Sequence, residues 1–234
     1  MHHFRAPDAR RFISASLMIG IAFGNFGASF GVLSVSAGAS VAQSCAMSLL
    51  VFTGASQMSA VSVLASGGTV ASAFGGAVLL SGRNAVYGLA MSPVLKEGSL
   101  ASRLLGAQWV IDETTAIVSA ETDPTTRRTA FWISGAILYA SWNIGTLLGA
   151  LVGSSINPSD FGLDAAFPVM FTAMIAPHLR TSAGRKAALF GSVAAVALAP
   201  FMPIGLPILV SALGMLFGLS PASGEPTALT DGAP

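Results

Sequence analysis

The chain has 234 residues, of which 53% are hydrophobic and only 9% are charged, and its formal net charge is +1. A soluble globular domain carries about 25% charged residues, so a soluble fold of this length could not solvate its own surface. The mean hydropathy of +0.73 agrees with a chain that lies in the lipid bilayer. A net charge this close to zero leaves no electrostatic footprint for nucleic acid. We therefore expect an all-α polytopic membrane helix bundle.

Apolar segments separated by short polar connections fill most of the chain. We expect membrane spans at residues 12–36, 41–64, 70–91, 100–120, 129–153, 165–176 and 187–219. Three prolines interrupt the last block, which is either one span or a hairpin, so the bundle has seven or eight spans. The remaining parts are a cytoplasmic N-terminal segment, a polar connection and a disordered tail, at residues 1–11, 121–128 and 220–234.

Two glycine ladders predict close packing between helices. The first consists of Gly20, Gly24, Gly27 and Gly31, and the second of Gly145, Gly149 and Gly153. Small residues at this spacing share one helix face and let two backbones approach. The alternative is that this backbone lines the path of a substrate.

The second ladder also repeats part of the first. Asn25 and Gly27 recur as Asn143 and Gly145, each displaced by 118 residues. Internal repeats of this kind are common in secondary transporters, so we expect two structural halves, residues 12–120 and 129–219, built with broken helices.

The middle of the second predicted span contains a glycine among hydroxyl and amide side chains, in the stretch Thr53, Gly54, Ala55, Ser56 and Gln57. Backbone polar groups are tolerated at that depth only when they are buried in protein or face a cavity. Two interpretations are open: hydrogen bonds between neighbouring helices, or a broken helix that holds a polar ligand.

Arg83 lies inside the third predicted span, close to Asn84 and Tyr87. A cation at bilayer depth costs roughly 2.5 to 3.5 kcal/mol on insertion scales, so it faces protein or water and often marks a pathway. The fourth span contains Asp112 and Glu113. These acids either start a helix near the interface, or one of them exchanges a proton or pairs with Arg83.

The basic residues set an expected orientation. With the N-terminus in the cytoplasm, eight of the eleven lysines and arginines lie inside, which satisfies the positive-inside rule. In that arrangement Lys96 and Arg103 fall on the outer side, and Arg83 stays within the membrane.

Five landmarks together resemble the AzlC family of branched-chain amino acid permeases. They are the stretches at residues 53–57, 83–89, 112–113, 139–150 and 161–171. The resemblance implies the large subunit of a two-component exporter in the cytoplasmic (inner) membrane of a prokaryote, with a separate small AzlD-type subunit as its partner. Where the family commonly has Asn-x-Arg-His, this chain has Ser81-Gly82-Arg83-Asn84, so a proton relay through that histidine is not expected here.

The residues and the resemblance together predict a site for an amino acid substrate. Arg83 suits the carboxylate, because its fork of donors fits two oxygens. Backbone carbonyls near Gly54, with Gln57, suit the ammonium, and Phe52, Trp142 and Phe171 suit an apolar side chain. The expected substrate-binding residues are Thr53, Gly54, Ser56, Gln57, Arg83, Asn84, Tyr87, Trp142 and Asn143. The candidates for proton coupling are Asp112 and Glu113.

Other classes of protein fit less well. No His-Glu-x-x-His motif, Ser-His pattern or pair of aspartates in separate spans indicates an intramembrane enzyme. The single cysteine, Cys45, excludes a thiolate metal cage, and we expect no cofactor or metal. The alternatives to a carrier are a channel for an uncharged solute and a membrane scaffold subunit.

Overall fold

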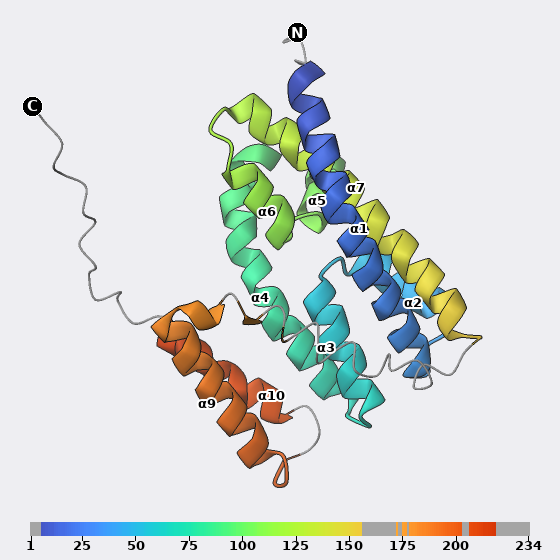
Figure 1. Ribbon diagram of the computed structural model, residues 1–234, viewed down its shortest axis with the longest axis vertical. Helices are drawn as coiled ribbons and strands as arrows, with labels where there is room; N and C mark the ends of the chain where they lie inside the picture. Colours follow the sequence, from blue (N-terminus) through green and yellow to red (C-terminus); the bar gives the residue numbers. More distant parts are fainter. Residues whose placement is uncertain (1–5, 156–171, 173–174, 177, 203–205, 219–234) are drawn as a thin grey trace, which may run out of the picture.

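The computed structural model describes residues 6–155, 172, 175–176, 178–202 and 206–218, and this part of the chain is helical with no strand (Figure 1). The long helices are α1 (Ala6–Ser36), α4 (Val70–Leu95) and α7 (Pro124–Gly153). Shorter ones are α2 (Val41–Leu50), α3 (Gly54–Ala65), α5 (Leu100–Gln108), α6 (Asp112–Ser119), α9 (Ser182–Leu198) and α10 (Leu206–Ser211). Among the described residues, two helices are long and apolar enough to cross a membrane, Ala9–Ser36 and Pro124–Gly153. The prediction of an all-α membrane helix bundle is confirmed.

Helices α1 and α7 lie side by side and run in the same direction (Figure 1). A Cβ atom on Gly145 would collide with the backbone of Gly24, and one on Gly149 would collide with the backbone of Ala28. Only glycine permits this approach, and the two helices that carry the ladders are packed against each other. The packing interpretation of the ladders is therefore confirmed.

The second predicted span is broken at residues 51–53 between α2 and α3, in agreement with the second of the two interpretations of this stretch. The chain turns back at this break, and a hydrogen bond joins the two helices: Gln57 Nε2 of α3 donates to the Met47 carbonyl of α2 at 3.0 Å. Helix α3 then runs beside α4, where the hydroxyls of Ser56 and Ser81 are 2.9 Å apart. The stretch is a hairpin of two half-length helices and does not cross the bundle as one helix.

A second hairpin, formed by α5 and α6, enters the bundle from the opposite end. The Thr114 hydroxyl shapes its tip: it donates to the Trp109 carbonyl at 2.8 Å and accepts from the Ile111 N–H at 3.1 Å. The tips of the two hairpins meet, since Gln108 Nε2 donates to the Leu49 carbonyl at 3.0 Å. The stretch at residues 100–120 is thus also a hairpin. The total span count and the division into halves stay predictions, because residues 156–171 lie outside the described part, as does the predicted tail.

The arrangement of the hairpins corrects the expected position of two basic residues. Because α2 and α3 together do not cross, α4 ends beside the beginning of α1 and α7. Glu97, next to Lys96, pairs with Arg128 of α7 at 3.2 Å. Lys96 and Arg103 were expected at the end opposite the N-terminus, and this was wrong.

Asp123 is the N-cap residue of helix α7, and its carboxylate stabilises the first turn of the helix, outside the membrane. Its carboxylate accepts from the Thr126 N–H at 2.8 Å and from the Thr126 hydroxyl at 2.9 Å. These bonds lower the pKa of Asp123 below its ordinary value of 3.8. A carboxyl group with a lowered pKa stabilises the folded state at pH values above its ordinary pKa. This stabilisation is lost as the pH falls through the pKa of the folded state.

We therefore expect the first turn of α7 to fray below about pH 4. Amide hydrogen exchange at Thr126 and Arg127, corrected for the intrinsic pH dependence, should lose protection there. In the Asp123→Asn variant, which keeps an acceptor but cannot titrate, the protection should be independent of pH. Equal pH dependence in both proteins would contradict this role of Asp123.

Candidate functional site

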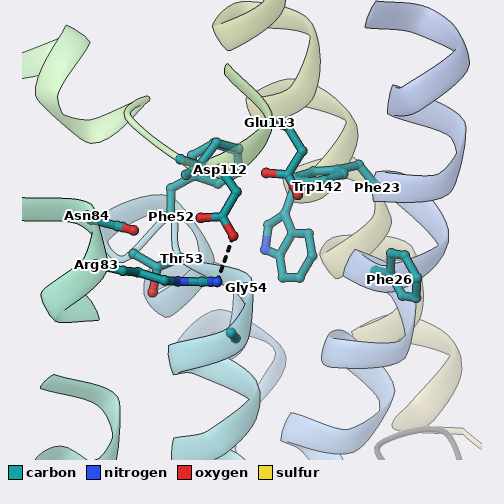
Figure 2. Close-up of a pocket in the computed structure, with 12 residues that line it drawn as sticks. Phe23, Phe26, Phe52, Thr53, Gly54, Arg83, Asn84, Asp112, Glu113 and Trp142 are labelled. Atoms are coloured by element: carbon teal, nitrogen blue, oxygen red, sulfur yellow. Dashed lines mark hydrogen bonds and ion pairs between the residues drawn. The ribbon is translucent and has the colours of Figure 1, made fainter. Parts of the chain in front are cut away.

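A cavity of about 120 Å³ lies where the two hairpin tips approach α1, α4 and α7 (Figure 2). One water needs roughly 10 to 15 Å³, so the space is larger than a single solvent site. Its lining comes from five helices and both tips: Phe23, Phe26, Phe52, Thr53, Gly54, Ala55, Arg83, Asn84, Ile111, Asp112, Glu113 and Trp142. The cavity thus brings together residues that are more than one hundred positions apart in the sequence.

Charged side chains occupy one side of the cavity. Arg83 Nη1 donates to Asp112 Oδ2 at 2.6 Å, and each of the two side chains is 34% exposed. Asp112 and Glu113 lie in the first turn of α6, where the positive end of the helix dipole favours carboxylates. The acids start a helix, although at a hairpin tip inside the bundle and not near the interface as the first interpretation had it, and the pairing of one of them with Arg83 is confirmed.

The N-terminus of α3 forms another side. Thr53 is the residue before the helix, and its hydroxyl makes no capping hydrogen bond. A Cβ atom on Gly54 would lie 2.8 Å from Cη2 of Trp142, so the indole packs directly on the helix end. The first N–H groups of a helix have no partner within the helix, and Gly54 and Ala55 of this first turn line the cavity.

Aromatic rings form the apolar wall. The Phe23 ring lies 5.7 Å from Trp142 and 6.4 Å from Phe52, in edge-to-face arrangements. Phe52 and Trp142 had been expected in such a wall, and Phe171 lies outside the described residues. Sequence reasoning missed Phe23 and Phe26, although both lie on the helix of the first glycine ladder.

Four of the expected substrate-binding residues do not line this cavity: Ser56, Gln57, Tyr87 and Asn143. The hydrogen bonds already described engage Ser56 and Gln57 within the α2–α3–α4 packing. Asn143 accepts from the Ser48 hydroxyl at 2.8 Å and donates to the Tyr139 carbonyl at 2.8 Å, so it ties α2 to α7. Tyr87 packs on a hydrophobic cluster that contains Phe12 and Met91. The cavity lining includes Thr53, Gly54, Arg83, Asn84, Trp142 and both acids.

The tips of two broken helices meet at a cavity with charged residues and an aromatic wall. This arrangement defines a class of helical membrane protein in which non-helical backbone lines a polar binding site inside the membrane. The family model described as AzlC protein matches residues 18–156, more than half of the chain. The chain belongs to the AzlC family, which confirms the resemblance found in the sequence.

The chain is also similar to bacterial membrane proteins. It is 28% identical over 206 residues to the inner membrane protein YgaZ of Escherichia coli, covering 82% of this chain and 84% of that protein. It is 26% identical over 199 residues to an uncharacterized membrane protein of Helicobacter pylori, covering 82% and 86%. No solved structure matches. The family and these relatives support a membrane protein of the transporter type.

Proposed function

We propose that this protein is a secondary transporter that exports branched-chain or similar apolar amino acids, and that it performs no chemical reaction on them. The observation that supports this function is the composition of the cavity, which combines one cation, two carboxylates and an aromatic wall. A zwitterion with an apolar side chain has three parts that match these three features.

The polar ends of the substrate fit different sides of the cavity. The guanidinium of Arg83 suits the substrate carboxylate. Asp112 and Glu113 suit the ammonium group better than the expected carbonyls near Gly54, because the N–H end of α3 lies at the cavity. Gln57 was expected to help bind the ammonium through its amide oxygen, which is buried and unpaired, but Gln57 does not line this cavity.

The ion pair suggests how transport is coupled to a proton or another cation. Arg83 is held by Asp112 at 2.6 Å, so a substrate carboxylate competes with Asp112 for the guanidinium. Protonation of Asp112 would remove that competition. We infer that a proton taken up at Asp112 or Glu113 accompanies the exchange of substrate, in keeping with the role of intramembrane acids in other carriers.

The surroundings of the protein complete the proposal. Basic residues gather at the end of the bundle where α1 and α7 begin, among them Arg10, Arg11, Lys96, Arg103 and Arg128. By the positive-inside rule this clustering supports a cytoplasmic N-terminus. We propose that the chain crosses the inner membrane of a prokaryote several times. The family resemblance supports a small AzlD-type subunit as partner.

Counterflow in proteoliposomes tests the function directly. Vesicles loaded with unlabelled valine or methionine should take up the labelled amino acid faster than empty vesicles, with or without the small subunit. Acceleration by substrate on the far side is a property of carriers. Uptake without acceleration would indicate a channel, and no uptake with the partner present would indicate a scaffold.

A further inference from the structure

Polar atoms without a hydrogen-bond partner gather around the cavity. Among the described residues, these buried atoms include Trp142 Nε1, Thr53 Oγ1 and Arg83 Nε, all from residues that line the cavity. Buried polar groups are nearly always paired, so unpaired ones call for an explanation. Two of the three are N–H groups, which can only donate.

Trp142 is the most informative of them. Its side chain is 3% exposed, so water in bulk does not satisfy the indole N–H. In Figure 2 the indole nitrogen lies on the edge of the ring that faces Arg83 and Asp112, not the edge facing Phe26. The unpaired donor is therefore directed at the charged side of the cavity.

The same ring lies against the N-terminus of α3, a helix of 12 residues. The Gly54 position contacts the six-membered ring of Trp142, at Cη2, Cζ3 and Cζ2, so Trp142 and the first residue of α3 border the cavity together. Thr53 leaves those groups uncapped and keeps its own hydroxyl unpaired. Helix N-termini with free N–H groups attract anions, and here the lining of the same cavity adds a buried, unpaired donor from another helix.

We propose that the indole N–H of Trp142, with Thr53 and the N-terminus of α3, forms the carboxylate subsite of the cavity, so that the protein selects solutes with a free carboxylate. This inference rests on the proposed function and adds the residues that read one end of the substrate. Arg83 borders the subsite and is shared between the substrate carboxylate and Asp112.

The neighbouring charges limit which anions this subsite accepts. Asp112 and Glu113 line the same cavity, and their carboxylates repel an additional negative charge on a bound solute. A dicarboxylate or a phosphate is therefore a poor fit. A monocarboxylate that carries an ammonium group satisfies the donors and the acids together.

The test compares L-leucine with L-leucinamide, which keeps the ammonium and the side chain but lacks the carboxylate. Binding of labelled leucine is measured with the purified protein in lipid nanodiscs, and leucinamide serves as competitor. We expect leucine to bind at least tenfold more tightly than leucinamide. In Trp142→Phe, leucine should bind about tenfold more weakly, since a hydrogen bond to a charged group is lost, while leucinamide is unaffected.

Trp109→Phe is the matched control. Trp109 also has a buried, unpaired indole nitrogen but does not line the cavity, so this variant should keep the preference for leucine. Thr53→Val is a second variant, which should lower the preference without removing a ring. If Trp142→Phe does not fold, Thr53→Val decides between a lowered and an unchanged preference.

The outcomes separate the two proposals. A folded Trp142→Phe protein with unchanged preference for leucine over leucinamide would overturn the carboxylate subsite and leave transport untouched. If Trp142 has only a structural role, Trp142→Phe should bind leucine and leucinamide more weakly by the same factor. That result would also overturn the carboxylate subsite. Failure of the unaltered protein to bind leucine or valine would instead contradict the proposed function.

Discussion

Replacing Arg83 by alanine should abolish counterflow of valine and lower the free energy of unfolding by about 2 kcal/mol. The variant leaves the Asp112 carboxylate without its cation inside the bundle, and breaking a fully buried pair costs about 3 to 5 kcal/mol. We expect about 2 kcal/mol here, less than for a fully buried pair, because both side chains are 34% exposed and solvent partly screens their charges. The measurements are counterflow in proteoliposomes and unfolding of the purified protein in a detergent titration.

The double variant Arg83→Ala/Asp112→Ala separates binding from stability. It removes both charges, so we expect stability to return to within about 1 kcal/mol of the unaltered protein while transport stays absent. Arg128→Gln breaks an exposed ion pair at the end of the bundle and should change the unfolding free energy by no more than about 1 kcal/mol. Transport by the double variant would show that Arg83 only neutralises Asp112.

The class of protein and the place of the break before α3 are visible in the sequence, although the sequence left open whether this polar stretch is a broken helix or joins helices by hydrogen bonds. Composition alone requires a membrane environment, because so few charged residues cannot cover a soluble surface. Gly54, next to hydroxyl and amide side chains, marks the break before α3, because such a combination of residues weakens a helix and exposes its backbone polar groups. Close packing of α1 on α7 was also predictable, because each ladder has one small residue per helical turn.

The direction of the half-helices was not predictable, because it depends on distant contacts. An apolar run of 24 residues is long enough for one crossing of about 30 Å or for two helices of about 15 to 18 Å each. The contact that joins the hairpin tips, from Gln108 to the Leu49 carbonyl, links residues 59 positions apart. The positions of Lys96 and Arg103 depend on the same choice, so their error had the same cause.

The charged residues of the candidate site were predicted from the sequence, but some of the aromatic residues in its wall were not. Arg83 and Asp112 stand out because a charge inside an apolar run is conspicuous. Polar residues such as Gln57 and Asn143 stand out equally, but the structure uses them to join helices. Phe23 and Phe26 give no such signal, because aromatic residues are ordinary in membrane helices, and only the placement of α1 shows their role.

Replacing Gly149 by valine should lower the free energy of unfolding by at least about 3 kcal/mol and abolish transport. The added Cβ would lie 2.6 Å from the carbonyl carbon of Ala28, and backbone cannot move aside as a flexible side chain can. Separating α1 from α7 would also displace Phe23 from Trp142 in the cavity wall. Gly88→Ala is the matched control: its Cβ meets nothing within 4 Å among the described residues, so it should stabilise α4 by about 0.5 to 1 kcal/mol. A Gly149→Val protein as stable as the unaltered one would contradict the backbone contact between α1 and α7, on which the placement of the cavity depends.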